Sequence, residues 1–136
     1  MNSIALVCAA AMGLLLFGLG LAVSALRMRS GTFNAGSVEI DSALHRVMRA
    51  HANTAEFTPL LVVLVLFLGS RSPATWILVC IVGVTVCRFL LVMGLVFTSS
   101  MSRPNLPRFV GALGTYFFGA ALCLALFRQA NCCAVG

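Results

Sequence analysis

The sequence contains no lysine and little charge of either sign. All nine of its basic residues are arginine, it has three acidic residues, and charged residues make up only 9% of its 136 residues. Hydrophobic residues make up 61%, more than the interior of a soluble domain of this length could bury. The shortage of charge therefore excludes an ordinary soluble domain and predicts an integral membrane protein.

The sequence also lacks the spacings that mark metal, nucleotide and nucleophilic sites. Its six cysteines include no CxxC pair, and they form neither a zinc spacing nor a disulfide framework. His45 and His51 lie near each other without a further ligand, so we expect no metal site. There is no P-loop, GxGxxG motif or nucleophile–base triad. Cys132 and Cys133 leave three interpretations open: acylation, metal binding or a simple polar tail.

The basic residues give a formal net charge of +6 but do not indicate a nucleic-acid partner. They are spread over the loops between apolar segments rather than gathered on one soluble face. Arginine presents a rigid fork of donors that suits carboxylates and phosphates. The use of arginine alone is also explained by a positive-inside bias combined with a coding preference, and both interpretations stay open.

Four apolar segments predict four membrane-spanning helices, at about residues 4–26, 42–68, 74–97 and 106–127. Each approaches or exceeds the ~20 residues that a helix needs to cross a bilayer, and the runs are too continuous for a β-barrel. The first run lacks a basic start and is followed by Arg27 and Arg29, so we expect a retained helix rather than a signal peptide. The fold class is all-α, a four-helix membrane bundle forming one domain over residues 1–136.

The arginines near the helix ends predict the orientation in the membrane. The loop after the first helix, with Arg27 and Arg29, and the loop after the third, with Arg103, outweigh the short turn between the second and third helices. The positive-inside rule then places these two loops in the cytoplasm and both termini outside.

Three of the polar residues in the second segment share one helical face and form the strongest indication of a binding site. Arg49, Asn53 and Glu56 are spaced by four and then three residues, which puts them on one face of a helix. A carboxylate and an amide at this depth are costly in hydrocarbon. We therefore expect this face to contact other protein or a water-filled pocket.

Two further features concern buried charge. Arg88 of the third helix and Glu56 are predicted to lie at matching depth and to pair, either as a structural pair or as the floor of a ligand pocket. Arg27, Arg46, Arg49 and Arg108 are predicted to converge near the cytoplasmic face, where the excess positive charge requires an anion. Lipid headgroups and a small anionic ligand are the two alternatives.

The run from Arg46 to Pro59, which reads Arg-Val-Met-Arg-Ala-His-Ala-Asn-Thr-Ala-Glu-Phe-Thr-Pro, resembles a known signature. It is similar to the second-helix motif of the MAPEG superfamily, the membrane-associated proteins in eicosanoid and glutathione metabolism. Arg88, the run Arg108-Phe-Val-Gly111 and Thr115 extend the resemblance over nearly the whole chain. The short chain looks most like the bacterial branch, whose members resemble microsomal glutathione transferases.

The resemblance implies a homotrimer in a bacterial inner membrane that binds glutathione as co-substrate between adjacent subunits. Arg49, Asn53 and Glu56 would hold the charged ends and amides of the tripeptide, with His51 nearby and Arg27 at the mouth of the pocket. Arg88 would brace Glu56 or reach the ligand. Arg108 would be catalytic, because it would stabilise the thiolate that attacks a hydrophobic electrophile arriving from the lipid.

The chain departs from the family pattern at three positions. Members with glutathione chemistry often carry Tyr or His one and two turns after the third-helix arginine, where this chain has Leu91 and Leu95. Phe57 stands where a tyrosine is common. Thiol activation would then depend on Arg108 alone. A membrane glutathione transferase or peroxidase is the first interpretation, and a non-catalytic binder of lipid or small molecules on the same scaffold is the alternative.

Overall fold

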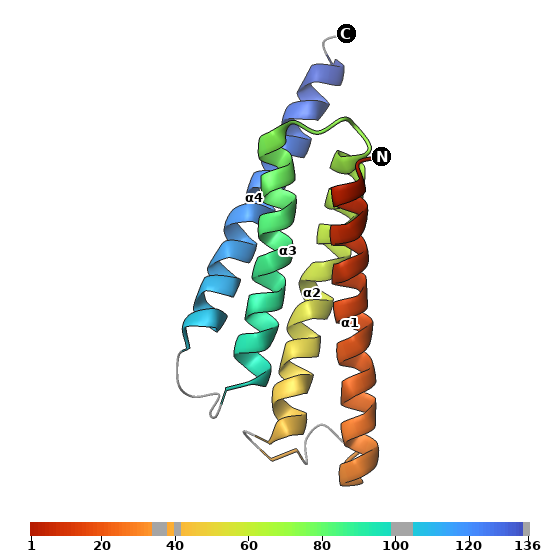
Figure 1. Cartoon of the computed structure of the whole chain (residues 1–136), viewed down its shortest axis with the longest axis vertical. Coiled ribbons are helices and arrows are strands. Elements are labelled where there is room, and N and C mark those ends of the chain that lie inside the picture. Colours follow the sequence, from red (N-terminus) through yellow and green to blue (C-terminus); the bar gives the residue numbers. More distant parts are fainter. Residues whose placement is uncertain (34–37, 40–41, 99–104, 135–136) are drawn as a thin grey trace.

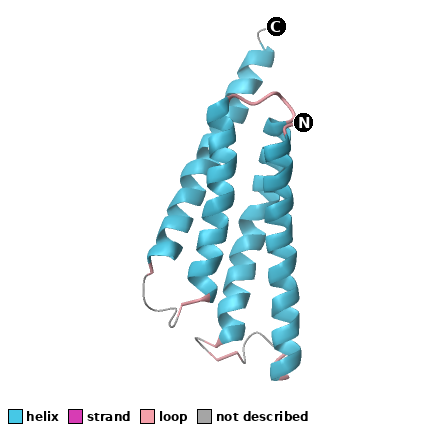
Figure 2. Cartoon of the chain, in the orientation of Figure 1, coloured by secondary structure: helices cyan, strands magenta, loops and turns pink. Residues whose placement is uncertain are grey.

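A computed structural model of the chain describes residues 1–33, 38–39, 42–98 and 105–134, with side chains described as far as residue 130. It contains helices α1 (Ser3–Ser30), α2 (Ala43–Gly69), α3 (Thr75–Val96) and α4 (Leu106–Ala134). Regular structure in the described residues is entirely helical (Figure 2), and all four helices are long and apolar enough to cross a membrane. The predicted all-α four-helix membrane fold is confirmed. The interpretations of Arg103 and of the Cys132 and Cys133 side chains lie outside this description.

Two helices continue further than the apolar runs predict. Helix α1 ends at Ser30 rather than at residue 26, and α4 continues to Ala134 rather than to residue 127. The reason is clear at α1: Gly31 adopts a left-handed conformation, with φ of 63°, that closes the helix. Arg27 and Arg29 lie in the last turn, where the partial negative charge of the helix end favours cations.

The helices associate as two pairs, α1 with α2 and α3 with α4, and α2 also packs on α3 in the middle (Figure 1). Helices α2 and α4 meet only sparsely. Both start at the end of the bundle that carries the loops before α2 and before α4, which we call the loop end. Helix α3 runs in the opposite direction. Helix α3 therefore lies against both α2 and α4, whereas α2 and α4 are packed less closely on each other.

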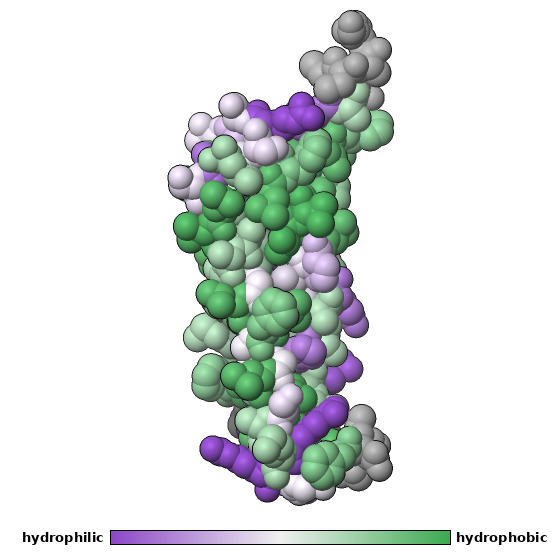
Figure 3. Space-filling model, turned by 90° about the vertical axis from the view of Figure 1, so that its right-hand side faces the viewer, coloured by the Kyte–Doolittle hydropathy of each residue, from purple (hydrophilic) through white to green (hydrophobic). Residues whose placement is uncertain are grey.

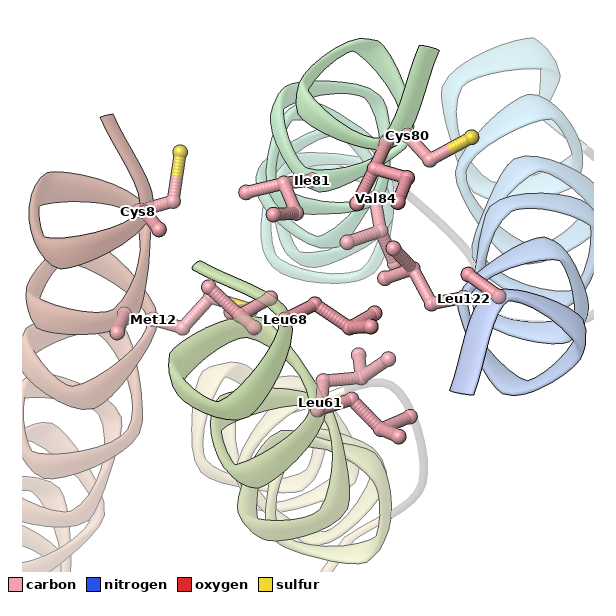
Figure 4. Close-up of a cluster of buried hydrophobic side chains, with 14 residues drawn as sticks. Cys8, Met12, Leu61, Leu68, Cys80, Ile81, Val84 and Leu122 are labelled. Atoms are coloured by element: carbon pink, nitrogen blue, oxygen red, sulfur yellow. The ribbon is translucent and has the colours of Figure 1, made fainter. Parts of the chain in front are cut away.

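The main apolar core lies away from the loop end, between all four helices (Figure 4). It includes Met12 of α1, Leu68 of α2, Ile81 of α3 and Leu122 of α4, each completely buried. The outward surface is also apolar, with polar surface gathered at the two ends and in a strip along one edge of the flank in Figure 3. An apolar core inside an apolar flank is the arrangement expected of a bundle in lipid.

Candidate functional site: a charged groove between α2, α3 and α4

A groove opens laterally between α2 and α4, with α3 as its back wall. Its volume is about 240 Å³, enough for a small organic ligand rather than a single water molecule. The lining combines three arginines and one carboxylate with aliphatic, aromatic and hydroxyl side chains: Arg49, Ala52, Asn53, Glu56, Phe57, Arg88, Leu91, Leu95, Arg108, Ala112, Thr115 and Tyr116. We call this set the α2–α4 groove.

The direction of the helices gives the groove two distinct ends. Because α2 and α4 both run inward from the loop end, Arg49 and Arg108 lie near the loops, together with Leu95 at the end of α3. Glu56, Phe57, Arg88 and Tyr116 lie further along their helices. We call these four residues the deep end of the groove, about 12 Å inside from Arg108 by the rise of an α-helix.

The polar stripe predicted from the sequence lies in this groove. Arg49 and Glu56 are both exposed, and within the described residues neither side chain makes a hydrogen bond or an ion pair. Asn53 is half-buried between them and faces α3. The stripe therefore presents one cation and one anion to whatever fills the groove, while its amide faces the bundle.

Arg88 is almost completely buried, with 1% of its surface exposed, and it is held by α2. Its Nη2 donates to the side-chain Oδ1 of Asn53 at 2.9 Å, to the main-chain oxygen of the same residue at 3.1 Å and to Oγ1 of Thr54 at 3.3 Å. These bonds compensate part of the cost of placing a guanidinium inside the bundle. Its Nε has no hydrogen-bond partner within the described chain.

Arg88 and Glu56 line the same end of the groove and interact electrostatically, but the direct pairing predicted for them is wrong. No ion pair joins them, although both residues lie within the described part of the chain. Matching depth fixes the position along a helix but not the direction in which a side chain points. The carboxylate of Glu56 is on the exposed side of α2, whereas the guanidinium of Arg88 reaches Asn53 and Thr54 on the buried side.

Arg108 lines the loop end of the groove, and the start of α4 fixes its backbone. The side chain of Asn105 accepts a hydrogen bond from the Arg108 main-chain N–H at 2.9 Å and donates one to the Gly94 oxygen of α3 at 2.7 Å. A Cβ at Gly94 would lie 2.5 Å from the Arg108 main-chain nitrogen, so only glycine permits this approach. Asn105 thus caps α4 and attaches it to α3 at once.

The predicted cluster of four arginines is divided, because only Arg49 and Arg108 line the groove. Arg27 Nη2 lies 4.0 Å from the Met48 sulfur, between α1 and α2. Arg46 Nη1 donates to the main-chain oxygen of Thr98 at 2.9 Å.

His51 also lies away from the groove, on the side of α2 that faces α1. Its Nε2 would be 3.3 Å from a Cβ at Gly20. No three His, Cys, Asp or Glu residues gather to hold a metal ion within the described part of the chain.

The deep end contains an aromatic stack that the sequence reasoning missed. The Arg88 guanidinium lies over the Phe57 ring, 5.3 Å from its centroid, and the Phe57 and Tyr116 rings are 5.7 Å apart. Tyr116 therefore shares the groove with Arg108. The available signal was the helical spacing of Arg108, Ala112 and Tyr116, which puts all three on one face of α4.

Fold and groove together define a class: a four-helix membrane protein with a laterally open charged groove. Comparison with known proteins gives the family. The model of the MAPEG family matches residues 5–128, so the chain belongs to that family. No curated protein and no solved structure matched it. The chain is thus an integral membrane protein of a family that acts in glutathione and eicosanoid metabolism and generally uses glutathione.

Proposed function

We propose that the protein is a membrane glutathione transferase or peroxidase that directs the glutathione thiolate at lipophilic electrophiles. The observation that carries the proposal is that the α2–α4 groove gathers Arg49, Asn53, Glu56, Arg88 and Arg108. These residues come from three helices, and for all five the resemblance to the MAPEG family implies a role toward glutathione. The lateral opening of the groove also suits a second substrate that is dissolved in the membrane.

The charges of the groove complement those of glutathione, which has two carboxylates and one ammonium group. The carboxylate of Glu56 is exposed and has no ion pair in the described chain, so it accepts hydrogen bonds from the ammonium. Arg49, equally without such a partner, binds a carboxylate through its fork of donors. Arg88 stays on α2 and orients Asn53 from behind. The groove thereby distinguishes an anionic peptide from a neutral thiol.

Arg108 is the residue proposed to activate the sulfur. A free thiol with a pKa of ~8.5 is mostly protonated at neutral pH, and a nearby guanidinium lowers that pKa. In a transferase reaction the thiolate forms a carbon–sulfur bond and the leaving group departs with its electron pair. In a peroxidase reaction two glutathione molecules reduce a hydroperoxide to an alcohol and water and become the disulfide.

The proposal includes a homotrimer. Arg49 and Glu56 face outward from the single chain, where contact with lipid would be costly for a charged group. A neighbouring subunit that covers the groove removes this cost and closes the site. Arg27 lies on the α1 side and is proposed to reach the mouth of a neighbour's groove. His51, packed on Gly20, is assigned to the α1–α2 contact instead.

The proposed setting is a bacterial inner membrane, with the loop end in the cytoplasm and both termini outside. The excess of arginine at the loop end supports this orientation. Glutathione would then enter from the cytoplasm, at the end of the groove where Arg49 and Arg108 lie.

One observation favours a second function, the non-catalytic binding of a lipid or small amphiphile. Leu91 and Leu95 give the back wall of the groove an aliphatic surface, and both are buried. A fatty-acid carboxylate on Arg49 or Arg108 with its chain against these leucines would fit the same groove. Such a ligand brings no cationic group to the carboxylate of Glu56, whereas glutathione brings its ammonium, which is why glutathione is preferred.

Comparing Arg108→Ala with wild type separates the two functions. The substitution keeps the main-chain N–H that Asn105 caps, so α4 should begin unchanged. We expect Arg108→Ala to bind glutathione. It should lose the activity that conjugates glutathione to a chlorodinitrobenzene, and its complex with glutathione should lose the ultraviolet absorbance of the thiolate. Arg128→Ala, an exposed arginine near the other end of α4, is the control. Full activity in Arg108→Ala would contradict the catalytic assignment.

A further inference from the structure

The back wall and the Phe57 ring leave the groove with few neutral hydrogen-bond donors. Leu91, Leu95 and Phe57 contribute none. Of the two hydroxyls in the lining, that of Thr115 donates to the main-chain oxygen of Gly111 at 2.7 Å. The Tyr116 hydroxyl makes no hydrogen bond within the described chain, although it interacts electrostatically with Arg88. It is therefore the lining hydroxyl that is available to a ligand.

The ring of Tyr116 is held in a defined position. It lies 5.7 Å from the Phe57 ring at an interplanar angle of 58°, and Phe57 in turn lies under the Arg88 guanidinium. Tilted aromatic pairs of this kind are favourable, and the buried Arg88 cannot move without losing its bonds to α2. Tyr116 is nevertheless 57% exposed in the single chain and lines the groove, so a ligand in the groove can contact its side chain.

The position of Tyr116 relative to the charges indicates which part of a ligand it meets. Tyr116 shares the deep end with Glu56, the groove's one carboxylate. Arg88, also at the deep end, is occupied by its bonds to α2. The other two arginines of the lining, Arg49 and Arg108, lie toward the loop end. An α-amino acid carries an ammonium and a carboxylate on the same carbon. If its ammonium binds Glu56, its carboxylate lies beside Tyr116.

We infer that Tyr116 determines which thiol the groove accepts: its phenol donates a hydrogen bond to the carboxylate of the γ-glutamyl head, while Glu56 binds the ammonium of the same head. The glycine carboxylate then lies toward Arg49. This inference rests on the proposed function, since it takes glutathione as the ligand. Tyr116 of α4 would thus supply the hydroxyl that Leu91 and Leu95 of the α3 wall cannot supply.

The experiment compares two thiols on wild type and Tyr116→Phe by calorimetry on the detergent-purified full chain. The variant removes only the hydroxyl and keeps the ring that contacts Phe57. We expect its Kd for glutathione to rise about tenfold, which corresponds to about 1.4 kcal/mol and fits one hydrogen bond to a charged group. Cysteinylglycine, which lacks the γ-glutamyl head, should bind both proteins equally and more weakly.

The controls and the contrary outcomes are distinct. Phe117→Leu changes the adjacent exposed residue of α4, which does not line the groove, and should bind both thiols as wild type does. Equal glutathione affinity in wild type and Tyr116→Phe overturns the assignment of Tyr116 while leaving the proposed function intact. Equal losses for both thiols also overturn it, because the hydroxyl would not then act on the γ-glutamyl head. Absence of glutathione binding to wild type overturns the proposed function itself.

Discussion

Asn53 and Arg49 are neighbours on one face of α2, but the structure predicts opposite effects of removing them. The Asn53 amide oxygen accepts a 2.9 Å hydrogen bond from the buried guanidinium of Arg88, whereas Arg49 is exposed and bonds to no described residue. Asn53→Ala should therefore destabilise the bundle, and Arg49→Ala should leave its stability unchanged and reduce ligand binding instead.

The loss of unfolding free energy expected for Asn53→Ala depends on the hydrogen bonds that Arg88 keeps in the variant. A hydrogen bond to a charged group contributes ~1.5–3 kcal/mol in water-soluble proteins, whereas polar contacts between membrane helices average ~0.6 kcal/mol and reach ~1.7. Arg88 keeps its bonds to the main-chain oxygen of residue 53 and to Thr54 in the variant. We therefore expect a loss of about 1–2 kcal/mol. Arg49→Ala should change the unfolding free energy by no more than about 0.5 kcal/mol.

The assay is reversible unfolding in mild detergent, followed by circular dichroism of the helices. Asn53→Asp is the matched control, because it keeps an oxygen opposite the guanidinium and should recover most of the stability of wild type. Asn53→Ala as stable as wild type, or Arg49→Ala as unstable as Asn53→Ala, would refute the division between a structural and a ligand-binding residue.

Two further predictions concern the contact between α3 and α4. In Gly111→Ala the new Cβ would lie 2.5 Å from the Leu91 main-chain nitrogen and 2.7 Å from the Cys87 oxygen, so the helices must separate at a cost of about 1–3 kcal/mol. Gly119→Ala, whose nearest neighbour would be at 3.7 Å, should unfold as wild type in the same detergent assay, and equal melting of the two variants would contradict the close approach. Asn105→Ala removes the cap of α4 and the bond to Gly94, which should cost about 1 kcal/mol and lower the conjugation rate through Arg108. Asn105→Asp keeps the cap but not the donor, so a normal rate in Asn105→Asp would show that the cap alone positions Arg108.

The fold was predictable because the lengths of the apolar runs determine the number of spanning helices. The residues at which the helices end were less predictable. Helix α1 continues past its apolar run until Gly31 adopts a left-handed conformation, and hydropathy does not report such a cap. The same limit applies to α4, which continues beyond residue 127.

The groove was predictable in part, and the helical period explains which part. Spacing within α2 placed Arg49, Asn53 and Glu56 on one face, and all three line the groove. The partner of Arg88 was not predictable, because depth along two helices leaves their rotation undetermined. The contact of Tyr116 with Phe57 depends on how α2 and α4 approach each other across the groove, and a single sequence does not give that approach.

Calorimetry with glutathione on the detergent-purified protein tests directly whether the α2–α4 groove is a glutathione site. Three proteins are compared: wild type, Arg49→Ala and Arg71→Ala, the last altering an exposed arginine in the turn at the opposite end of the bundle. We expect micromolar-to-millimolar binding of glutathione to wild type and Arg71→Ala, and a large loss of affinity in Arg49→Ala. Absence of binding to wild type, or equal binding to all three proteins, would contradict this expectation.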